Sequence, residues 1–208
     1  MLAFLNSPFG ATPHLVNNRA DDTTGETTPP MNDILYRPAE ADDALCLGVL
    51  ATQVFLDTYA PLGIRAAIAR QVLAHCSVAA YESLLANPGV TILVAECDAH
   101  LVGFSQVNDG ARHDLVPEAA TSELKRLYVQ EGFTGRGIGR DLLRHAEKAA
   151  AARGADTLWL TAYTGNARAL QFYPRRGYED LGAVVFSFEG EDHPNRLYAK
   201  RIRRVATA

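Results

Sequence analysis

The sequence has few cysteines, no long apolar segment and no excess of positive charge, and each shortage excludes a class of protein. The chain of 208 residues contains 3 cysteines, Cys46, Cys76 and Cys97, which stand far apart and form no Cys-x-x-Cys pair. An odd number of scattered cysteines does not suit a disulfide framework or a zinc site, and it fits a reducing compartment. We therefore expect no metal site and a cytoplasmic location.

Two further absences argue against membranes and nucleic acids as partners. No apolar run approaches the ~18 residues that a membrane-spanning helix needs, and residues 1–5 lack the basic and apolar regions of a signal peptide. The formal net charge is −4, whereas a domain that binds nucleic acid is normally basic.

The composition is that of a soluble globular protein. Hydrophobic residues make up 48% and charged residues 21% of the chain, which are ordinary proportions. Residues 12–30, however, are rich in Asn, Asp, Thr, Gly and Pro, and such a stretch cannot bury enough apolar surface to offset its ordering entropy. We predict a flexible N-terminal extension over residues 1–30, with Met31 as an alternative start, and one domain over residues 31–208.

The domain has a mixed α/β (α+β) pattern. Apolar periodicity and turn residues predict strands at 34–37, 90–95, 101–107, 123–129, 157–162, 183–188 and 197–202, and helices near 42–59, 65–75, 79–86, 137–153 and 166–176. One strand–helix–strand unit, from Glu123 to Ala162, makes its two strands parallel with a right-handed connection. The flanking hairpins predict that the rest of the sheet is antiparallel.

A glycine-rich turn joins the strand at 123–129 to the following helix. Glycine lets backbone N–H groups converge on a ligand, and a helix N-terminus adds free donors and a positive dipole end. The turn therefore predicts an anion cradle that suits a pyrophosphate, although an ordinary tight turn with a solvated basic face is the alternative. Arg140 and Arg144 share a helix face and repel each other, and a phosphorylated ligand would relieve that repulsion. The glycines and basic residues concerned are Gly135, Gly137, Gly139, Arg136, Arg140 and Arg144.

Two phosphate-binding motifs are excluded. A Walker loop needs Gly-Lys-Ser/Thr at the helix start, but Gly139 is followed by Arg140-Asp141. A dinucleotide fingerprint needs G-x-G-x-x-G within a mainly parallel sheet, and the spacing here is G-x-G-x-G.

The segment Thr134-Gly135-Arg136-Gly137-Ile138-Gly139 resembles the Gln/Arg-x-x-Gly-x-Gly/Ala motif of the GNAT superfamily of N-acetyltransferases. A second motif follows in the right order: Asn166, Ala169, Phe172-Tyr173 and Gly177-Tyr178 match Asn-x-x-Ala-x-x-Phe/Leu-Tyr-x-x-x-Gly-Phe. The resemblance covers roughly residues 34–203, and within the family it points to the bacterial spermidine/spermine-acetylating branch. Thr134 and Pro174 depart from the family pattern.

The resemblance implies direct acetyl transfer from acetyl-CoA to an amine, without a metal. It implies a twisted, mostly antiparallel sheet whose central parallel strands are splayed around acetyl-CoA, with helices on both faces. Backbone groups of Leu127 and Val129 would pair with the pantetheine arm, the loop would hold the pyrophosphate, and Asn166 would contact the cofactor or simply cap its helix. The implied cofactor-binding residues are Leu127, Tyr128, Val129, Thr134, Gly135, Arg136, Gly137, Ile138, Gly139, Arg140, Asn166 and Tyr173.

Acetylation requires a base, because an alkyl ammonium with a pKa near ~10.4 is almost wholly charged at neutral pH. A carboxylate can accept the proton directly or through one water. Glu123 is the first candidate because it opens the strand that leads to the glycine-rich turn, although a surface role at a strand end is the alternative. Glu82, Asp57 and Glu118 are less specific candidates.

The leaving thiolate requires a proton donor. Tyr173 matches the family tyrosine in this role, and a phenol with a pKa near ~10 suits a thiolate of comparable basicity. The alternative is a core tyrosine, with Tyr163 and Tyr128 as substitutes. Inside a helix Pro174 removes a hydrogen bond and clashes with the carbonyl of Leu170, and the sequence leaves open whether the resulting kink shifts Tyr173.

The acceptor is expected to be a primary amine of a small molecule, and a homodimer is compatible with the sequence. A polyamine is one candidate, since Glu189, Glu191 and Asp192 could attract a cation. A peptide or protein N-terminus is the main alternative. A CoA-binding regulatory module without catalysis is another, because of Thr134 and Pro174. His145 is expected to be solvated, and Trp159 to lie in the core.

Overall fold

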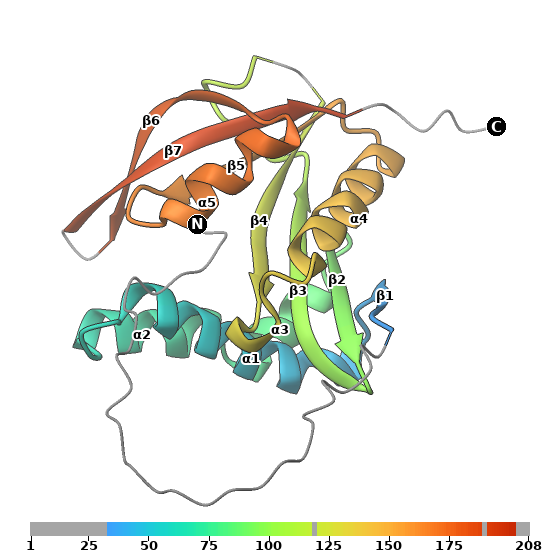
Figure 1. The fold of residues 1–208 in the computed structure, drawn as a ribbon, viewed down its shortest axis with the longest axis vertical. Coiled ribbons are helices and arrows are strands. Elements are labelled where there is room, and N and C mark those ends of the chain that lie inside the picture. Colours follow the sequence, from blue (N-terminus) through green and yellow to red (C-terminus); the bar gives the residue numbers. More distant parts are fainter. Residues whose placement is uncertain (1–32, 118–119, 189–190, 203–208) are drawn as a thin grey trace, which may run out of the picture.

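The computed structural model describes residues 33–117, 120–188 and 191–202. Within them one seven-stranded sheet has the order β1-β2-β3-β4-β5-β7-β6 (Figure 1). The strands are β1 (Leu35–Pro38), β2 (Val90–Cys97), β3 (His100–Asp109), β4 (Thr121–Val129), β5 (Thr157–Tyr163), β6 (Glu179–Phe188) and β7 (Glu191–Arg201). The helices are α1 (Ala44–Tyr59), α2 (Ala66–His75), α3 (Val78–Leu85), α4 (Ile138–Ala152) and α5 (Ala167–Phe172), with short 3₁₀ turns η1 (Ala41–Asp43), η2 (Glu131–Phe133) and η3 (Pro174–Arg176).

The central strands β4 and β5 are parallel and separate from each other. Their pairing runs from Thr121↔Thr157 to Glu123↔Trp159, and every other strand pair is antiparallel. After Glu123, β5 continues against β7, while the described residues provide no strand partner for β4 on that side. The predicted mixed sheet with a splayed parallel pair is confirmed.

A β-bulge in β4 accompanies this separation. Gln106 pairs with Arg126 and Val107 pairs with Leu124, so Lys125 is the extra residue. A bulge bends its strand and increases the local twist, which turns the end of β4 away from β5. It also shifts the alternation of side chains by one position.

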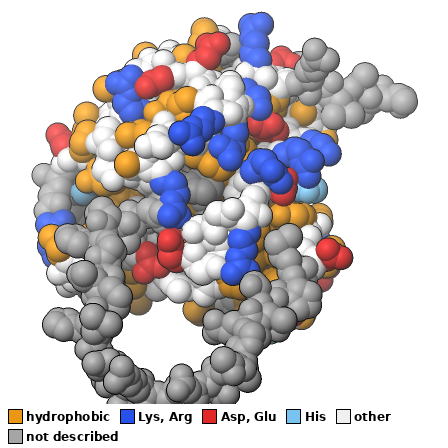
Figure 2. Space-filling view, viewed as in Figure 1, with side chains coloured by type: hydrophobic (Ala, Val, Ile, Leu, Met, Phe, Trp, Pro, Cys, Tyr) orange, Lys and Arg blue, Asp and Glu red, His pale blue; other side chains and the backbone are white. Residues whose placement is uncertain are grey.

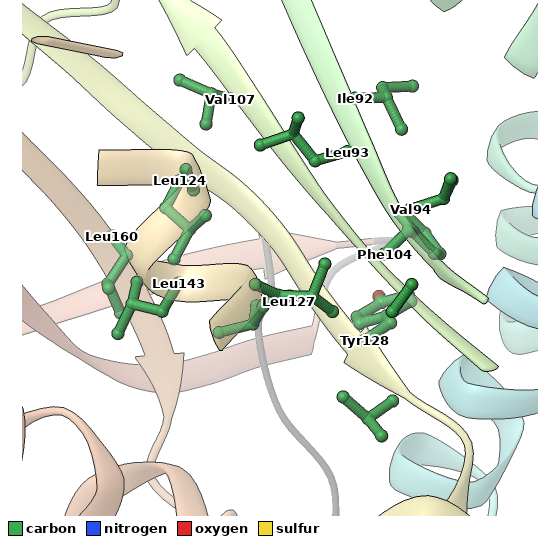
Figure 3. Packing of buried hydrophobic residues seen from close by; sticks show 14 of the residues in the cluster. Ile92, Leu93, Val94, Phe104, Val107, Leu124, Leu127, Tyr128, Leu143 and Leu160 are labelled. Atoms are coloured by element: carbon green, nitrogen blue, oxygen red, sulfur yellow. The ribbon is translucent and has the colours of Figure 1, made fainter. Parts of the chain in front are cut away.

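Helices cover both faces of the sheet, as predicted. Gly103 of β3 lies against α4, since a Cβ there would be 3.2 Å from Leu142 Cδ1. On the opposite face, the ring of Phe104 meets that of Tyr81 of α3 edge to face, with centroids 5.8 Å apart. Figure 3 shows the same division, with Leu124 and Leu127 on the side of Leu143, and with Phe104 and Tyr128 on the other side.

The predicted helix over 166–176 is wrong in its second half. Pro174 has no N–H to continue the α-helix, so α5 ends at Phe172, and Pro174 opens the separate turn η3. Gly177 then reverses the chain with a φ of 81°. Both strands of the last hairpin also begin earlier in the chain than predicted, at Glu179 and Glu191.

Two predictions about aromatic residues have different outcomes. Trp159 is buried, and its Nε1 donates to the carbonyl of Ala111 at 3.0 Å, so the prediction of a core residue is confirmed. His145 is not simply solvated, because its ring stacks on that of Tyr36 with centroids 5.1 Å apart.

The predicted extension over residues 1–30 lies outside the described residues.

Candidate active site

A cavity of about 590 Å³ opens where β4, α4 and α5 meet. We call it the arginine cavity, because four arginines belong to its lining. It is lined by Val129, Phe133, Thr134, Gly135, Arg136, Gly137, Ile138, Gly139, Arg140, Arg168, Phe172 and Arg176. The glycine-rich turn and the start of α4 thus form one wall, and α5 with η3 forms the other.

The glycine-rich turn presents backbone donors to this cavity. Gly135 and Gly137 have φ values of 77° and 86°, a conformation that L side chains rarely adopt. A Cβ at Gly137 would also lie 3.1 Å from Arg140 Nη2. Among the residues that the structure describes, no side chain caps α4, and the first backbone bond back to its N-cap comes from Asp141 N–H to the Gly137 carbonyl. The first N–H groups of α4 therefore remain available to an anion.

Positive charge is concentrated around the arginine cavity. Figure 2 shows Lys and Arg side chains gathered across the face that carries α4 and α5. Burial, together with the charges of Arg140 and Arg175, lowers the pKa of Arg176. Its guanidinium carbon lies 3.5 Å from the centroid of the Phe172 ring. Guanidinium groups that repel one another in this way favour a polyanionic ligand.

The predicted repulsion between Arg140 and Arg144 is already offset within the protein. The Asp141 carboxylate lies 3.1 Å from Arg140 Nη2 and 3.4 Å from Arg144 Nη2. Arg140 is bound most closely, since its guanidinium donates to both Asp141 oxygens. A phosphorylated ligand is therefore not needed to relieve that particular repulsion.

Thr134 is used within the turn itself. Its hydroxyl donates to the Glu131 carbonyl at 2.9 Å. This residue departs from the family pattern, and its side chain supports the backbone of the loop.

Backbone groups near the end of β4 point into the gap between β4 and β5. The Gln130 N–H donates to the Val102 carbonyl of β3 at 2.9 Å. Because backbone groups alternate along a strand, those of Tyr128 also face β3, while those of Leu127 and Val129 face away from it. The ring of Tyr128 packs on Phe104 with centroids 5.3 Å apart.

Asn166 caps α5 and still has a free donor. Its Oδ1 accepts a hydrogen bond from the Ala169 N–H at 3.0 Å. The residue is 2% exposed, and its Nδ2 has no hydrogen-bond partner among the described residues. The cap role and a ligand role are therefore compatible, and an oxygen of a bound molecule fits this amide.

Tyr173 lies fully buried between α5 and η3. Its ring contacts those of Phe172, Tyr178 and Tyr198, with centroid separations of 5.2, 5.6 and 6.0 Å. Burial raises the pKa of Tyr173 well above its ordinary value, so the phenol keeps its proton at neutral pH. Pro174 begins a new turn, while Tyr173 keeps helical dihedral angles, which answers the question that the sequence left open about this proline.

A second cavity, of about 690 Å³, lies beyond the end of β5. We call it the aromatic cavity. It is lined by residues 57–65 together with Ile68, Tyr163, Gly165 and His193. The Tyr163 ring lies 5.8 Å from that of Tyr59 and 6.3 Å from that of His193. Asp57 is the one carboxylate among its described lining residues, and burial and the nearby Glu131 raise its pKa.

The aromatic cavity approaches Tyr173 through Tyr59. Burial raises the pKa of Tyr59 well above its ordinary value, and the phenols of Tyr128, Tyr163 and Tyr173 raise it further. The Tyr59 hydroxyl is therefore within electrostatic reach of each of these three phenols. Sequence reasoning missed this cavity because its walls come from the α1–α2 connection, β5 and β7, which share no motif.

Glu123 lies at the point where β4 and β5 separate, and it is 7% exposed. Its Oε1 accepts from Lys125 Nζ at 3.1 Å, and its Oε2 accepts from Asn108 Nδ2 at 3.4 Å. Of the other candidate bases, Asp57 lines the aromatic cavity and Glu82 is exposed on α3, while Glu118 lies outside the described residues.

The three acidic residues predicted to attract a cation are only partly described. Glu189 lies outside the described residues, and the side chain of Glu191 is not described either. Asp192 accepts a hydrogen bond from the Ser187 hydroxyl at 2.5 Å. Among the described side chains, no group of three His, Cys, Asp or Glu is placed to hold a metal ion, and no described helix is long and apolar enough to cross a membrane.

Residues 63–178 match the acetyltransferase (GNAT) family. The chain belongs to this family. The acetyltransferase is 31% identical over 153 residues to an uncharacterized N-acetyltransferase from Mycobacterium tuberculosis, with 74% of this chain and 93% of that protein covered. It is 33% identical over 100 residues to streptothricin acetyltransferase from Streptomyces lavendulae, which covers 48% of this chain and 50% of that enzyme.

Solved structures agree with the GNAT fold. The PaiA N-acetyltransferase of Thermoplasma acidophilum, crystallised with coenzyme A, superposes with a TM-score of 0.62 at 23% identity and covers 81% of this chain and 99% of its own. An aminoglycoside 6′-acetyltransferase of type Ii gives a TM-score of 0.61 at 20% identity, covering 81% of this chain and 97% of that one. The predictions of an N-acetyltransferase, of this fold and of acetyl-CoA as the acetyl donor are confirmed.

Proposed function

We propose that this GNAT enzyme transfers the acetyl group of acetyl-CoA directly to a primary amine of a small molecule held in the aromatic cavity. The observation that carries the proposal is the position of Tyr173. It follows Phe172 on the wall of the arginine cavity, and the same β5–α5 segment of the chain supplies Tyr163 and Gly165 to the aromatic cavity. An acetyl donor and an amine bound in the two cavities would approach each other near this phenol.

The arginine cavity has the groups that acetyl-CoA needs. The loop from Thr134 to Arg140 offers N–H groups and guanidinium charge for the pyrophosphate. The outward-facing backbone of Leu127 and Val129 offers partners for the pantetheine amides, as an added strand would. Asn166 Nδ2, at the start of α5, offers a further buried donor. Acetyl-CoA supplies the activated acetyl group, and the residues named here hold and orient it.

Glu123 and Tyr173 are the proposed proton acceptor and donor. Glu123 accepts the ammonium proton, directly or through one water, which frees the nitrogen lone pair. As the nitrogen–carbon bond forms and the carbon–sulfur bond breaks, Tyr173 donates its proton to the departing sulfur. The nitrogen of the newly formed, still protonated amide then gives its second proton to the Tyr173 phenolate, which restores the phenol.

The walls of the aromatic cavity favour an amine attached to an apolar or aromatic group over a polyamine. A polyamine carries several positive charges along its length, and each buried charge needs a partner. The described lining offers Asp57 alone for that purpose, whereas Tyr59, Tyr163 and His193 offer rings and Ile64 and Ile68 offer aliphatic surface. One ammonium group on an aromatic carrier matches this set.

A thiol-release screen tests the proposal with 2-phenylethylamine, spermidine, alanine, an aminoglycoside and a short peptide as acceptors. We expect the highest kcat/KM with the arylalkylamine. A higher value with spermidine or the peptide would overturn the proposed acceptor class. Calorimetric binding of acetyl-CoA without turnover of any amine would support a regulatory module, and no binding at high micromolar concentration would overturn the cofactor assignment itself.

A further inference from the structure

Glu123 is the last member of a line of hydrogen bonds that begins at a buried guanidinium. Arg126 Nη1 donates to Gln106 Oε1, and Gln106 Nε2 donates to Asn108 Oδ1 at 2.9 Å. Asn108 Nδ2 then donates to Glu123 Oε2 at 3.4 Å. The four residues form two directly opposed pairs of β3 and β4, Gln106↔Arg126 and Asn108↔Glu123. They lie on one face of the sheet, the face that α3 covers through Tyr81.

The direction of this line follows from the chemistry of its members. A guanidinium has five N–H donors and no acceptor, so it can bind only the oxygen of the Gln106 amide. The Gln106 nitrogen must then face Asn108, whose oxygen accepts. The Asn108 nitrogen is thereby turned toward Glu123, which can accept as a carboxylate. Flipping either amide would set two donors or two acceptors against each other.

The burial of Arg126 fixes the position of this series of hydrogen bonds. It is 8% exposed, and among the described residues no carboxylate lies within ion-pair distance of it. Its guanidinium carbon lies 5.8 Å from the centroid of the Tyr81 ring. A buried charge without a counter-ion depends on its hydrogen bonds, so the Gln106 oxygen is held firmly and fixes the rest of the line.

We propose that Asn108 is a positioning residue, which sets the orientation of the Glu123 carboxylate for proton abstraction from the acceptor amine. Gln106 and Arg126 act one and two steps further back by fixing the Asn108 amide. The proposal rests on the proposed function, in which Glu123 is the base. Lys125 holds the other oxygen of Glu123 at 3.1 Å. Asn108 and Lys125 thus hold one carboxylate oxygen each, and loss of the Asn108 amide would release the oxygen that it orients.

A double-mutant cycle tests the proposal. We expect Asn108→Ala to lower kcat about 10-fold to 100-fold, the cost of misplacing a reacting group, and to change the calorimetric Kd of acetyl-CoA less than about twofold. Since Asn108 acts through Glu123, adding Asn108→Ala to Glu123→Gln should cause no further loss. Glu123→Gln keeps an oxygen for Asn108 and removes the proton-accepting function.

Two further variants separate positioning from folding. Asn108→Asp keeps the size of the side chain and replaces the donor by an acceptor, so it should lose at least as much kcat as Asn108→Ala while the protein still folds. Ser105→Ala is the control. It removes a buried hydroxyl from the same strand, on the opposite face and outside the hydrogen-bonded line, and it should leave kcat unchanged.

The outcomes distinguish this proposal from the proposed function. An unchanged kcat in Asn108→Asp, or equal losses from Asn108→Ala in the presence and absence of Glu123→Gln, would overturn the positioning role alone. An unchanged kcat in Glu123→Gln would overturn the base assignment and the positioning role together.

Discussion

Glu123 of β4 pairs with Trp159 of β5 in the last of the register pairs that join the two parallel strands. Beyond this pair, β4 bulges at Lys125 and β5 follows β7. Glu123, the candidate base, therefore lies where β4 and β5 separate. The arginine cavity and the aromatic cavity lie further along these two strands, at Val129 and Tyr163. Several consequences of this arrangement can be measured.

Replacing Tyr173 by Phe removes the candidate proton donor and keeps the ring that packs on Tyr178 and Tyr198. General acid catalysis contributes on the order of 10²-fold or more, so kcat should fall by about that factor, with the Kd of acetyl-CoA within about twofold of wild type. Tyr198→Phe is the matched control, since it removes a neighbouring phenol without a proposed role. Unchanged turnover in Tyr173→Phe would exclude the residue as the donor.

Replacing Gly137 by Ala should weaken acetyl-CoA binding. The residue has a φ of 86°, and its new Cβ would crowd Arg140 Nη2 at 3.1 Å, which disturbs the N–H groups at the start of α4. Strain of about 1–2 kcal/mol is expected from the left-handed conformation alone. We expect at least a 10-fold higher Kd by calorimetry.

Gly154→Ala separates strain from binding in that experiment. Gly154 follows the other end of α4 with a φ of 92°, and a Cβ there meets no atom within 4 Å. Gly154→Ala should lower the melting temperature about as much as Gly137→Ala does, and it should leave the Kd of acetyl-CoA unchanged. A similar rise in Kd for both variants would mean that Gly137 acts through stability alone.

Asn166 can be tested for its two roles separately. Asn166→Asp keeps the oxygen that caps α5 and removes the Nδ2 donor, so stability should be retained while acetyl-CoA binding weakens. Asn166→Ala should lose both, with a fall of about 1 kcal/mol in the free energy of unfolding. If the two variants bind acetyl-CoA as tightly as wild type, Asn166 is a helix cap and nothing more.

The acceptor cavity is tested with Tyr163→Ala. The change removes the ring that lies between Tyr59 and His193, so KM for 2-phenylethylamine should rise about 10-fold, while the Kd of acetyl-CoA stays the same. Leu73→Ala, an exposed position on α2, is the control for a general effect of truncation. An unaltered KM in Tyr163→Ala would place the amine elsewhere.

The buried tyrosines should make stability fall in alkaline solution. Burial raises the pKa of both Tyr173 and Tyr178 in the folded protein, the latter with help from the Glu147 carboxylate. The unfolded chain therefore releases these protons first, near pH ~10. The stability they contribute is complete below that pH and is lost as the pH rises toward their folded values.

Urea unfolding between pH 8 and 11 measures this loss. We expect the wild-type free energy of unfolding to decline above pH ~10, and the decline to be shallower in Tyr178→Phe. An equally steep decline in the variant would assign the alkaline sensitivity to other groups.

The sequence alone was sufficient to predict the glycine-rich wall of the arginine cavity, because the chemistry of that wall is local, whereas Arg168 and Arg176 reach the cavity only through the packing of α5 and η3. Gly135, Gly137 and the start of α4 are adjacent in the chain, so their spacing already specifies which N–H groups converge. Asn166 was likewise interpretable as a cap from its position before a helix. The end of this helix was misjudged. Pro174 disrupts a helix only where the helix has to continue past the proline, and α5 ends before it.

The residues around Glu123 and the aromatic cavity proposed for the acceptor amine could be determined only from the tertiary structure. Glu123 and Arg126 are three positions apart, so simple alternation would put them on different faces of the sheet. The bulge at Lys125 brings both to one face, where they pair with Asn108 and Gln106 of β3. A bulge arises from the pairing of two strands, and the aromatic cavity from three segments far apart in the chain. Residues that are neighbours in the chain determined the anion cradle of the glycine-rich turn. Long-range packing determined that Asn108 faces the candidate base and that an aromatic cavity faces the amine.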